Sequence, residues 1–210
     1  MNKIVILCVF LASHSVMLVA QESEVFSNQV YGHKDGMALY YDIEVPAQSS
    51  GRGIIFIVSG GWHSGKENLN ISRPFWEVLL AQGYTIFQLY HPSMPTYQIP
   101  DAYEGVKSGV LHILDNASRY GITHKKIGLF GISSGGHLAL LSAYDPEVEG
   151  EYEIGAVVAL MPPTDLRGDE FDQILFGVSP MDFDAALIPA LSPILQVDAN
   201  DPPTPRPERR

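Results

Sequence analysis

The chain has 210 residues, of which 46% are hydrophobic and 18% are charged, a composition typical of a folded globular protein and not of a disordered one. A chain of this size buries roughly 70% of the surface that its unfolded form exposes, so one domain with a sizeable core is expected. The 13 basic and 24 acidic residues give a formal net charge of −11. Because a field of that sign repels phosphate backbones, we expect no nucleic-acid partner.

The first twenty residues have the pattern of a secretory signal peptide. Lys3 precedes the apolar run 4–12, a Ser-His-Ser interruption and a second apolar run that ends at Ala20. The alternative is a membrane anchor, but a membrane span needs roughly 20 uninterrupted apolar residues. We therefore expect a signal peptide at 1–20, cleavage near Ala20, a secreted or periplasmic protein and no stable membrane span after cleavage. Cleavage would also remove Cys8, the only cysteine, and with it any disulfide or thiol chemistry.

Strands and helices are expected to alternate along the remaining chain. Two short extended stretches within 30–45 flank a Lys-Asp-Gly turn and predict a hairpin. Apolar runs rich in β-branched and aromatic residues predict strands buried on both faces, at 54–58, 84–90, 127–130 and 156–161. Helical spacing of apolar residues predicts helices at 75–82, 102–121 and 135–143. The alternation predicts one α/β domain at 24–204, with a mostly parallel sheet flanked by helices. After residue 165 no clear period remains.

A glycine-flanked turn stands between a predicted strand and a predicted helix. Gly131-Ile132-Ser133-Ser134-Gly135 fits the pattern G-x-S-x-G, in which a serine hydroxyl projects from a sharp turn and the glycines permit the crowded backbone. We interpret Ser133 as a nucleophile, with Gly131 and Gly135 as the elbow glycines and the N–H of Ser134 as an oxyanion donor. The alternative is an ordinary glycine-rich turn. His137, one helical turn further, is interpreted as a packed structural histidine and not as a base.

A second glycine-rich loop, 59–65, directly follows the first buried strand. Consecutive glycines leave backbone N–H groups unobstructed, so Gly60 and Gly61 are candidate oxyanion donors. The alternative is a flexible turn. Trp62 either walls an acyl pocket or packs in the core, and His63 lies either at a pocket rim or on the surface; the residues alone leave both questions open.

These two motifs, in this order, resemble the α/β-hydrolase superfamily. The closest branch is that of esterases and lipases with an H-G-G-G-W loop and a G-x-S-x-G-G-H elbow, which includes hormone-sensitive-lipase-like and feruloyl-esterase-like enzymes. The resemblance implies that Ser133 is the nucleophile and that Gly60, Gly61 and Ser134 form the oxyanion hole. It also implies a small-molecule or carbohydrate-linked ester as substrate, with no metal and no organic cofactor. The chain departs from the family loop by placing Val58-Ser59 where His-Gly is usual.

The base of a serine triad is missing from its usual place in the chain. The family order is Ser, then Asp or Glu, then His, but no histidine follows His137. The last six residues, 205–210, contain no apolar side chain except proline, so we expect an unstructured tail there and no central strand. We therefore expect an incomplete hydrolase domain, ended by a frameshift, an early stop or a gene-model error, without the C-terminal strands and helices. Recruitment of an earlier histidine, with Asp165 or another acid to orient it, is the less favoured alternative.

The leading functional hypothesis is hydrolysis of carboxylic esters through Ser133. The first alternative is a non-catalytic or inactive α/β-hydrolase fragment that lacks the triad acid and histidine. The second is a serine peptidase of the same superfamily, which the short N-terminal part argues against. The substrate and the oligomeric state are left open by the sequence.

Overall fold

The computed structural model describes residues 23–148, 152–168 and 178–204, so the predicted signal peptide and the tail at 205–210 lie outside the described residues. The elements in chain order are β1 (Glu24–Lys34), β2 (Met37–Val45), β3 (Arg52–Ile57), η1 (Lys66–Asn68), α1 (Leu69–Ala81), β4 (Tyr84–Leu89), α2 (Ile99–Asn116), η2 (Ala117–Tyr120), β5 (Lys126–Ile132), α3 (Ser134–Tyr144), β6 (Glu153–Leu160), η3 (Ala185–Leu187) and η4 (Pro193–Leu195). Within these ranges no helix is both long and apolar enough to cross a membrane.

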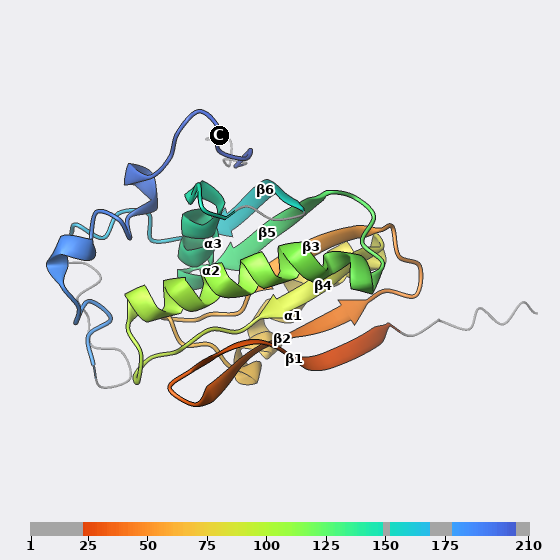
Figure 1. The fold of residues 1–210 in the computed structure, drawn as a ribbon, viewed down its shortest axis with the longest axis horizontal. Helices are drawn as coiled ribbons and strands as arrows, with labels where there is room; N and C mark the ends of the chain where they lie inside the picture. The colour runs from red at the N-terminus through yellow and green to blue at the C-terminus, as the bar shows by residue number, and fades with distance from the viewer. Residues whose placement is uncertain (1–22, 149–151, 169–177, 205–210) are drawn as a thin grey trace, which may run out of the picture.

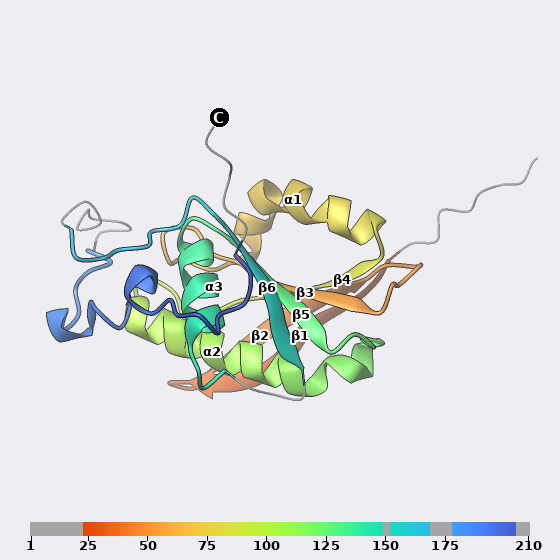
Figure 2. The ribbon, with the colours of Figure 1, turned by 90° about the horizontal axis from the view of Figure 1, so that it is seen from above.

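Six strands form one sheet in the order β1-β2-β4-β3-β5-β6 (Figure 1). The strands β4, β3, β5 and β6 are parallel to one another, whereas β2 of the β1–β2 hairpin pairs with β4 in antiparallel orientation. Helix α1 covers one face of the sheet, and α2 and α3 cover the other (Figure 2). The predicted α/β architecture with a mostly parallel sheet is therefore confirmed.

The central strands are buried on both faces, as their continuous apolar runs predicted. Ile55 and Ile57 of β3 pack in the core shared with α2 and α3. Phe56, between them in sequence, belongs to the second core beneath α1, where its ring lies 4.6 Å from that of Trp76. Because successive side chains of a strand point to opposite faces, one short apolar run supplies both cores.

Two elements, β1 and α1, begin about six residues earlier than the sequence predicted, whereas the other starts differ by at most three residues. Strand β1 begins at Glu24 and not near residue 30, because a register irregularity after Phe26, with Asn28 at a φ of 56°, interrupts the alternation that marks a strand. Helix α1 begins at Leu69 and not at residue 75. Pro74 lies inside it and removes one hydrogen bond, but the burial of Trp76 against the sheet holds the helix in place.

Helix α1 covers its face of the sheet only in part. A groove of about 500 Å³ runs between α1 and the strands β5 and β6, and its lining is mainly apolar. Val78 of α1 and Val158 of β6 line it and are 60% and 39% exposed. The described residues therefore leave an apolar strip uncovered beside α1.

Candidate active site

Ser133 lies at a sharp turn between β5 and α3. Its φ of 52° and ψ of −122° are rare for a residue with a side chain. Two hydrogen bonds hold this conformation: the Ser133 N–H donates to the carbonyl of Leu160 at 2.8 Å, and the Ser133 carbonyl accepts from the N–H of His137 at 3.0 Å. The side chain is exposed. Strain at a turn that presents a hydroxyl to solvent is typical of a functional serine.

The glycines on either side of the turn are required by close packing. A Cβ on Gly131 would overlap the carbonyl oxygen of Gly135. A Cβ on Gly135 would lie 2.6 Å from the carbonyl oxygen of Ile57, at the end of β3. Any larger residue at either position would therefore push the start of α3 away from the sheet.

The loop 59–65 lies next to this turn because its strand does. Strands β3 and β5 are parallel neighbours, so their carboxyl ends meet at one edge of the sheet. A hydrogen bond of 3.0 Å between the hydroxyls of Ser59 and Ser134 joins the loop to the start of α3. Ser59 thus contributes a contact that the sequence did not predict, although its place where the related loops have glycine was the available signal.

The two candidate glycines of the loop differ in their hydrogen bonding. The Gly60 N–H donates to the carbonyl of His63 at 2.8 Å, and the His63 N–H donates back at 3.1 Å. The turn between them places Gly61 and Trp62 at positive φ, 59° and 56°. No hydrogen bond among the described residues uses the N–H of Gly61. The Gly60 N–H is engaged inside the loop, which leaves Gly61 as the loop's candidate oxyanion donor.

His137 is a structural residue, as its position in the helix predicted. Its side chain is fully buried. Nδ1 accepts a hydrogen bond from the Trp62 indole at 3.1 Å, and Nε2 donates to the carbonyl of Leu191 at 2.8 Å. An indole only donates, so the proton of the neutral ring is on Nε2. Burial lowers the pKa of His137 to about 4. With both nitrogens engaged, His137 cannot take a proton from Ser133, and it ties Trp62 into the core.

The described residues supply no base to Ser133. None of them forms a hydrogen bond with its Oγ. Asp165 lies after β6, where its carboxylate is paired with the guanidinium of Arg167 at 2.6 Å. That hydrogen bond holds the pKa of Asp165 at about 2. Recruitment of an earlier histidine with Asp165 as its orienting acid therefore finds no support in these contacts. No group of three or more His, Cys, Asp or Glu residues in the described ranges is placed to hold a metal ion.

The hydroxyl of Ser59 offers a test of the link between loop and turn. Ser59→Ala removes the hydrogen bond to Ser134 and is expected to lower the free energy of unfolding by about 1 kcal/mol. Urea unfolding of the variant and of the wild type measures this difference in the free energy of unfolding. Ser27→Ala, at an exposed serine of β1, is the matched control and should leave the free energy within about 0.5 kcal/mol. A urea midpoint of Ser59→Ala equal to that of the control would show that the hydrogen bond between Ser59 and Ser134 does not stabilise the protein.

Comparison with known proteins places the chain in a family. Residues 41–205 match the model of the BD-FAE family. The chain belongs to the BD-FAE family. Its fold is that of the α/β-hydrolases, in agreement with the resemblance drawn from the two glycine motifs. No curated protein matches the chain significantly.

Solved structures of esterases share the fold. Esterase B from Lactobacillus rhamnosis, inhibited by a C6-C4 SN3 compound, superposes with a TM-score of 0.70 and 20% identity over 88% of this chain and 65% of that chain. Thermogutta terrifontis esterase 2 superposes with a TM-score of 0.66 and 24% identity over 89% of this chain and 70% of that chain. The BD-FAE chain thus spans about two thirds of the length of these esterases. At these identities the likeness establishes the fold alone.

Proposed function

We propose that this BD-FAE protein hydrolyses carboxylic esters by acyl transfer through Ser133. The observation that carries the proposal is the exposed hydroxyl of Ser133 on a strained turn at the start of α3, next to the loop that holds Gly61. In the first step the Ser133 oxygen bonds to the ester carbonyl carbon and the bond from that carbon to the alcohol oxygen breaks. The alcohol leaves with the proton that the serine hydroxyl loses. Water then releases the acid and restores the serine.

The N–H groups of Ser134 and Gly61 are proposed to stabilise the oxyanion that forms in this step. Ser134 is the first residue of α3, where backbone N–H groups have no partner within the helix and the helix dipole favours negative charge. Two such donors account for roughly 10²–10³ in rate each. Gly60 is proposed to shape the loop through its bonds to His63 and not to donate.

Acylation of Ser133 is the direct test, because it requires the nucleophile and the oxyanion donors. A general base would only increase its rate. We expect p-nitrophenyl acetate to add one acetyl group to the purified chain, and mass spectrometry of its peptides to locate the adduct at Ser133. Ser133→Ala is expected to lose the adduct and the release of p-nitrophenol that accompanies it. Ser108→Ala, at an exposed serine of α2, is the matched control and should retain both.

The absence of a base among the described residues makes a second readout informative. Because no described group takes the serine proton, the Ser133-dependent rate is expected to rise steadily with pH and to increase when imidazole is added. Imidazole also attacks the ester by itself, so the comparison is the increase over Ser133→Ala in the same buffer. No acyl adduct with or without imidazole would favour the non-catalytic alternative instead. The serine peptidase alternative has no supporting observation here.

Export to the periplasm or the medium is likewise a proposal, which rests on the pattern of residues 1–20 alone. The ester substrate is proposed to be a small molecule or an ester linked to carbohydrate, with no resident metal or cofactor.

A further inference from the structure

The apolar groove beside α1 continues into a second cavity at the amino ends of the strands. The groove has a volume of about 500 Å³ and the second cavity one of about 320 Å³. Ile54, Gly128 and Ala156 line both. The two hollows therefore adjoin, on the face of the sheet that α1 covers only in part (Figure 2). Each volume lies in the range of ligand pockets.

Basic side chains line the second cavity, which is therefore called the basic cavity. Arg52 and Lys126 line it together with His124. Because side chains alternate along a strand, Arg52 lies on the same face of β3 as Phe56, and Lys126 on the same face of β5 as Phe130. Both phenylalanines belong to the core beneath α1. The two cations therefore project from the same face of the sheet as the apolar groove.

The two cations also lie side by side. Ile54 of β3 pairs with Gly128 of β5, so Arg52 and Lys126, each two residues earlier, stand on neighbouring strands about 4.8 Å apart. Both side chains are exposed. A single anionic group can therefore contact both.

Nearby carboxylates compensate these cations only in part. The Arg52 guanidinium lies 5.9 Å from the centre of the Tyr84 ring, and no ion pair among the described residues includes it. The Lys126 ammonium lies 4.0 Å from a carboxylate oxygen of Glu153, with the two side chains 71% and 73% exposed. An exposed pair at this distance contributes little. A second anion is therefore favoured between Arg52 and Lys126.

The apolar groove complements a hydrocarbon chain. Phe75 and Val78 of α1 and Val158 of β6 line it and are 47%, 60% and 39% exposed. None of its lining residues, all of which lie in the described part of the chain, is charged. Burial of apolar surface is favourable in proportion to the area removed from water, and an uncovered apolar strip is typical of a binding groove. The groove and the basic cavity together suit a ligand with an apolar chain and an anionic end.

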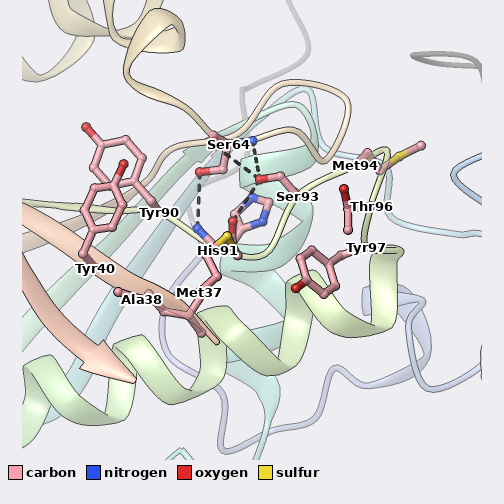
Figure 3. A pocket seen from close by; sticks show the side chains of 11 residues that line it. Met37, Ala38, Tyr40, Ser64, Tyr90, His91, Ser93, Met94, Thr96 and Tyr97 are labelled. Atoms are coloured by element: carbon pink, nitrogen blue, oxygen red, sulfur yellow. Dashed lines mark hydrogen bonds between the residues drawn. The ribbon is translucent and has the colours of Figure 1, made fainter. Parts of the chain in front are cut away.

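The cavity beside the loop 59–65 lacks this combination. Its walls come from the start of β2, the segment 90–97 after β4, and Ser64 (Figure 3). The two lysines near its tyrosine rings are each paired with a carboxylate, Lys34 with Asp101 at 2.8 Å and Lys66 with Asp42 at 3.0 Å. This cavity therefore serves as an internal comparison for the groove.

We propose that the apolar groove and the basic cavity bind a medium-chain fatty acid, with its hydrocarbon chain against α1 and β6 and its carboxylate between Arg52 and Lys126. Lys126 is the first residue of β5 and Ser133 follows the last, so the carboxylate would lie roughly 20 Å from Ser133. The site is therefore distinct from the proposed ester-hydrolysing centre and does not depend on its activity.

Octanoate, 1-octanol and butanoate are matched probes, because octanol lacks the charge and butanoate lacks half of the chain. In ligand-detected NMR titrations of the purified chain at pH 7.5, octanoate is expected to bind about fivefold more tightly than 1-octanol, as an exposed ion pair implies. It is expected to bind roughly tenfold more tightly than butanoate, because fewer methylene groups of butanoate are buried. Equal affinity for octanoate and 1-octanol would overturn the placement of the carboxylate, and absence of octanoate binding would reject the proposal.

Variants locate the two ends of the ligand. Val78→Glu places a carboxylate in the apolar groove and is expected to weaken octanoate binding at least about tenfold. Val25→Glu, at a valine of β1 that is 57% exposed and outside the lining, is the matched control and should keep the wild-type affinity. Arg52→Gln should reduce the affinity for octanoate to that for 1-octanol, whereas Arg119→Gln, at an exposed arginine of η2, should not. Unchanged octanoate affinity in Val78→Glu would place the ligand elsewhere and reject the proposal.

Two further variants and one measurement distinguish other sites and other occupants. Ser133→Ala should keep the affinity for octanoate, which separates this site from the proposed hydrolytic one. Ala38→Phe, at an exposed residue that lines the cavity of Figure 3, should also keep it, and a loss there would move the ligand to that cavity. Analytical ultracentrifugation tests whether a second copy covers the groove. A dimer that Val78→Glu dissociates and Val25→Glu does not would overturn the proposal in favour of self-association.

Discussion

Gly131→Ala is expected to destabilise the protein by about 3 kcal/mol and to reduce acylation of Ser133 at the same time. The added Cβ would overlap the carbonyl oxygen of Gly135, which is backbone and cannot rotate away. Overpacking of a rigid site typically costs 1–3 kcal/mol, and a backbone clash lies at the upper end of that range. Relief requires α3 to shift, and this moves Ser133 and the N–H of Ser134 away from the loop.

Urea unfolding followed by circular dichroism measures the loss of stability. Gly32→Ala is the matched control, because a Cβ at Gly32 of β1 meets nothing within 4 Å. We expect the control to unfold within about 0.5 kcal/mol of the wild type. Equal stability of the two alanine variants would contradict the close contact between the start of α3 and the end of β5.

The stability of the fold is expected to fall by about 2 kcal/mol for each of two buried histidines as the pH is lowered from 7.5 to 5. Burial lowers the pKa of both His91 and His137 from 6.5 to about 4. Between these values the unfolded chain binds protons that the folded chain does not, so acid favours unfolding. The stabilisation is complete above pH 6.5 and is lost progressively as the pH falls toward 4.

Free energies of unfolding at a series of pH values between 7.5 and 5 test this expectation. His91→Asn and His137→Asn each remove one of the two groups and should each reduce the loss of stability over this pH range by about 2 kcal/mol. His33→Asn, at an exposed histidine of β1, should retain the wild-type slope. If neither His91→Asn nor His137→Asn changed the dependence of the free energy of unfolding on pH, other groups would control the acid sensitivity.

The regular elements could be predicted because each is encoded over a short stretch. A strand such as β3 is marked by five consecutive apolar residues, whose only stable placement is inside a covered sheet. The turn at Ser133 was recognisable because the backbone on either side of it is so crowded that glycine is needed there. Helix α1 and strand β1 were predicted too short because Pro74 and the irregularity near Asn28 break the local pattern, and only packing shows that the elements continue through them.

Contacts between distant segments were beyond prediction. The bond between Ser59 and Ser134 joins residues 75 positions apart, and the interpretation of Trp62 stayed open until its bond to His137 showed that it packs in the core. The His137 bond to Leu191 likewise depends on a segment without any periodic pattern. Such contacts follow from which strand ends are neighbours in the sheet.

By itself the sequence determined the fold class, the order of its elements and the exposed serine turn between a strand and a helix, since all of these depend on residues close together in the chain. The tertiary structure decided which loop N–H groups are engaged: the Gly60 N–H donates to His63, whereas the Gly61 N–H has no hydrogen bond to any residue that the structure describes. It also decided that His137 is a neutral structural residue and that Nε2 of His91 is buried without a hydrogen-bond partner among the described residues. The physical reason is that hydrogen-bond partners and burial, which set the chemistry of these groups, are properties of the packed chain and not of its local pattern.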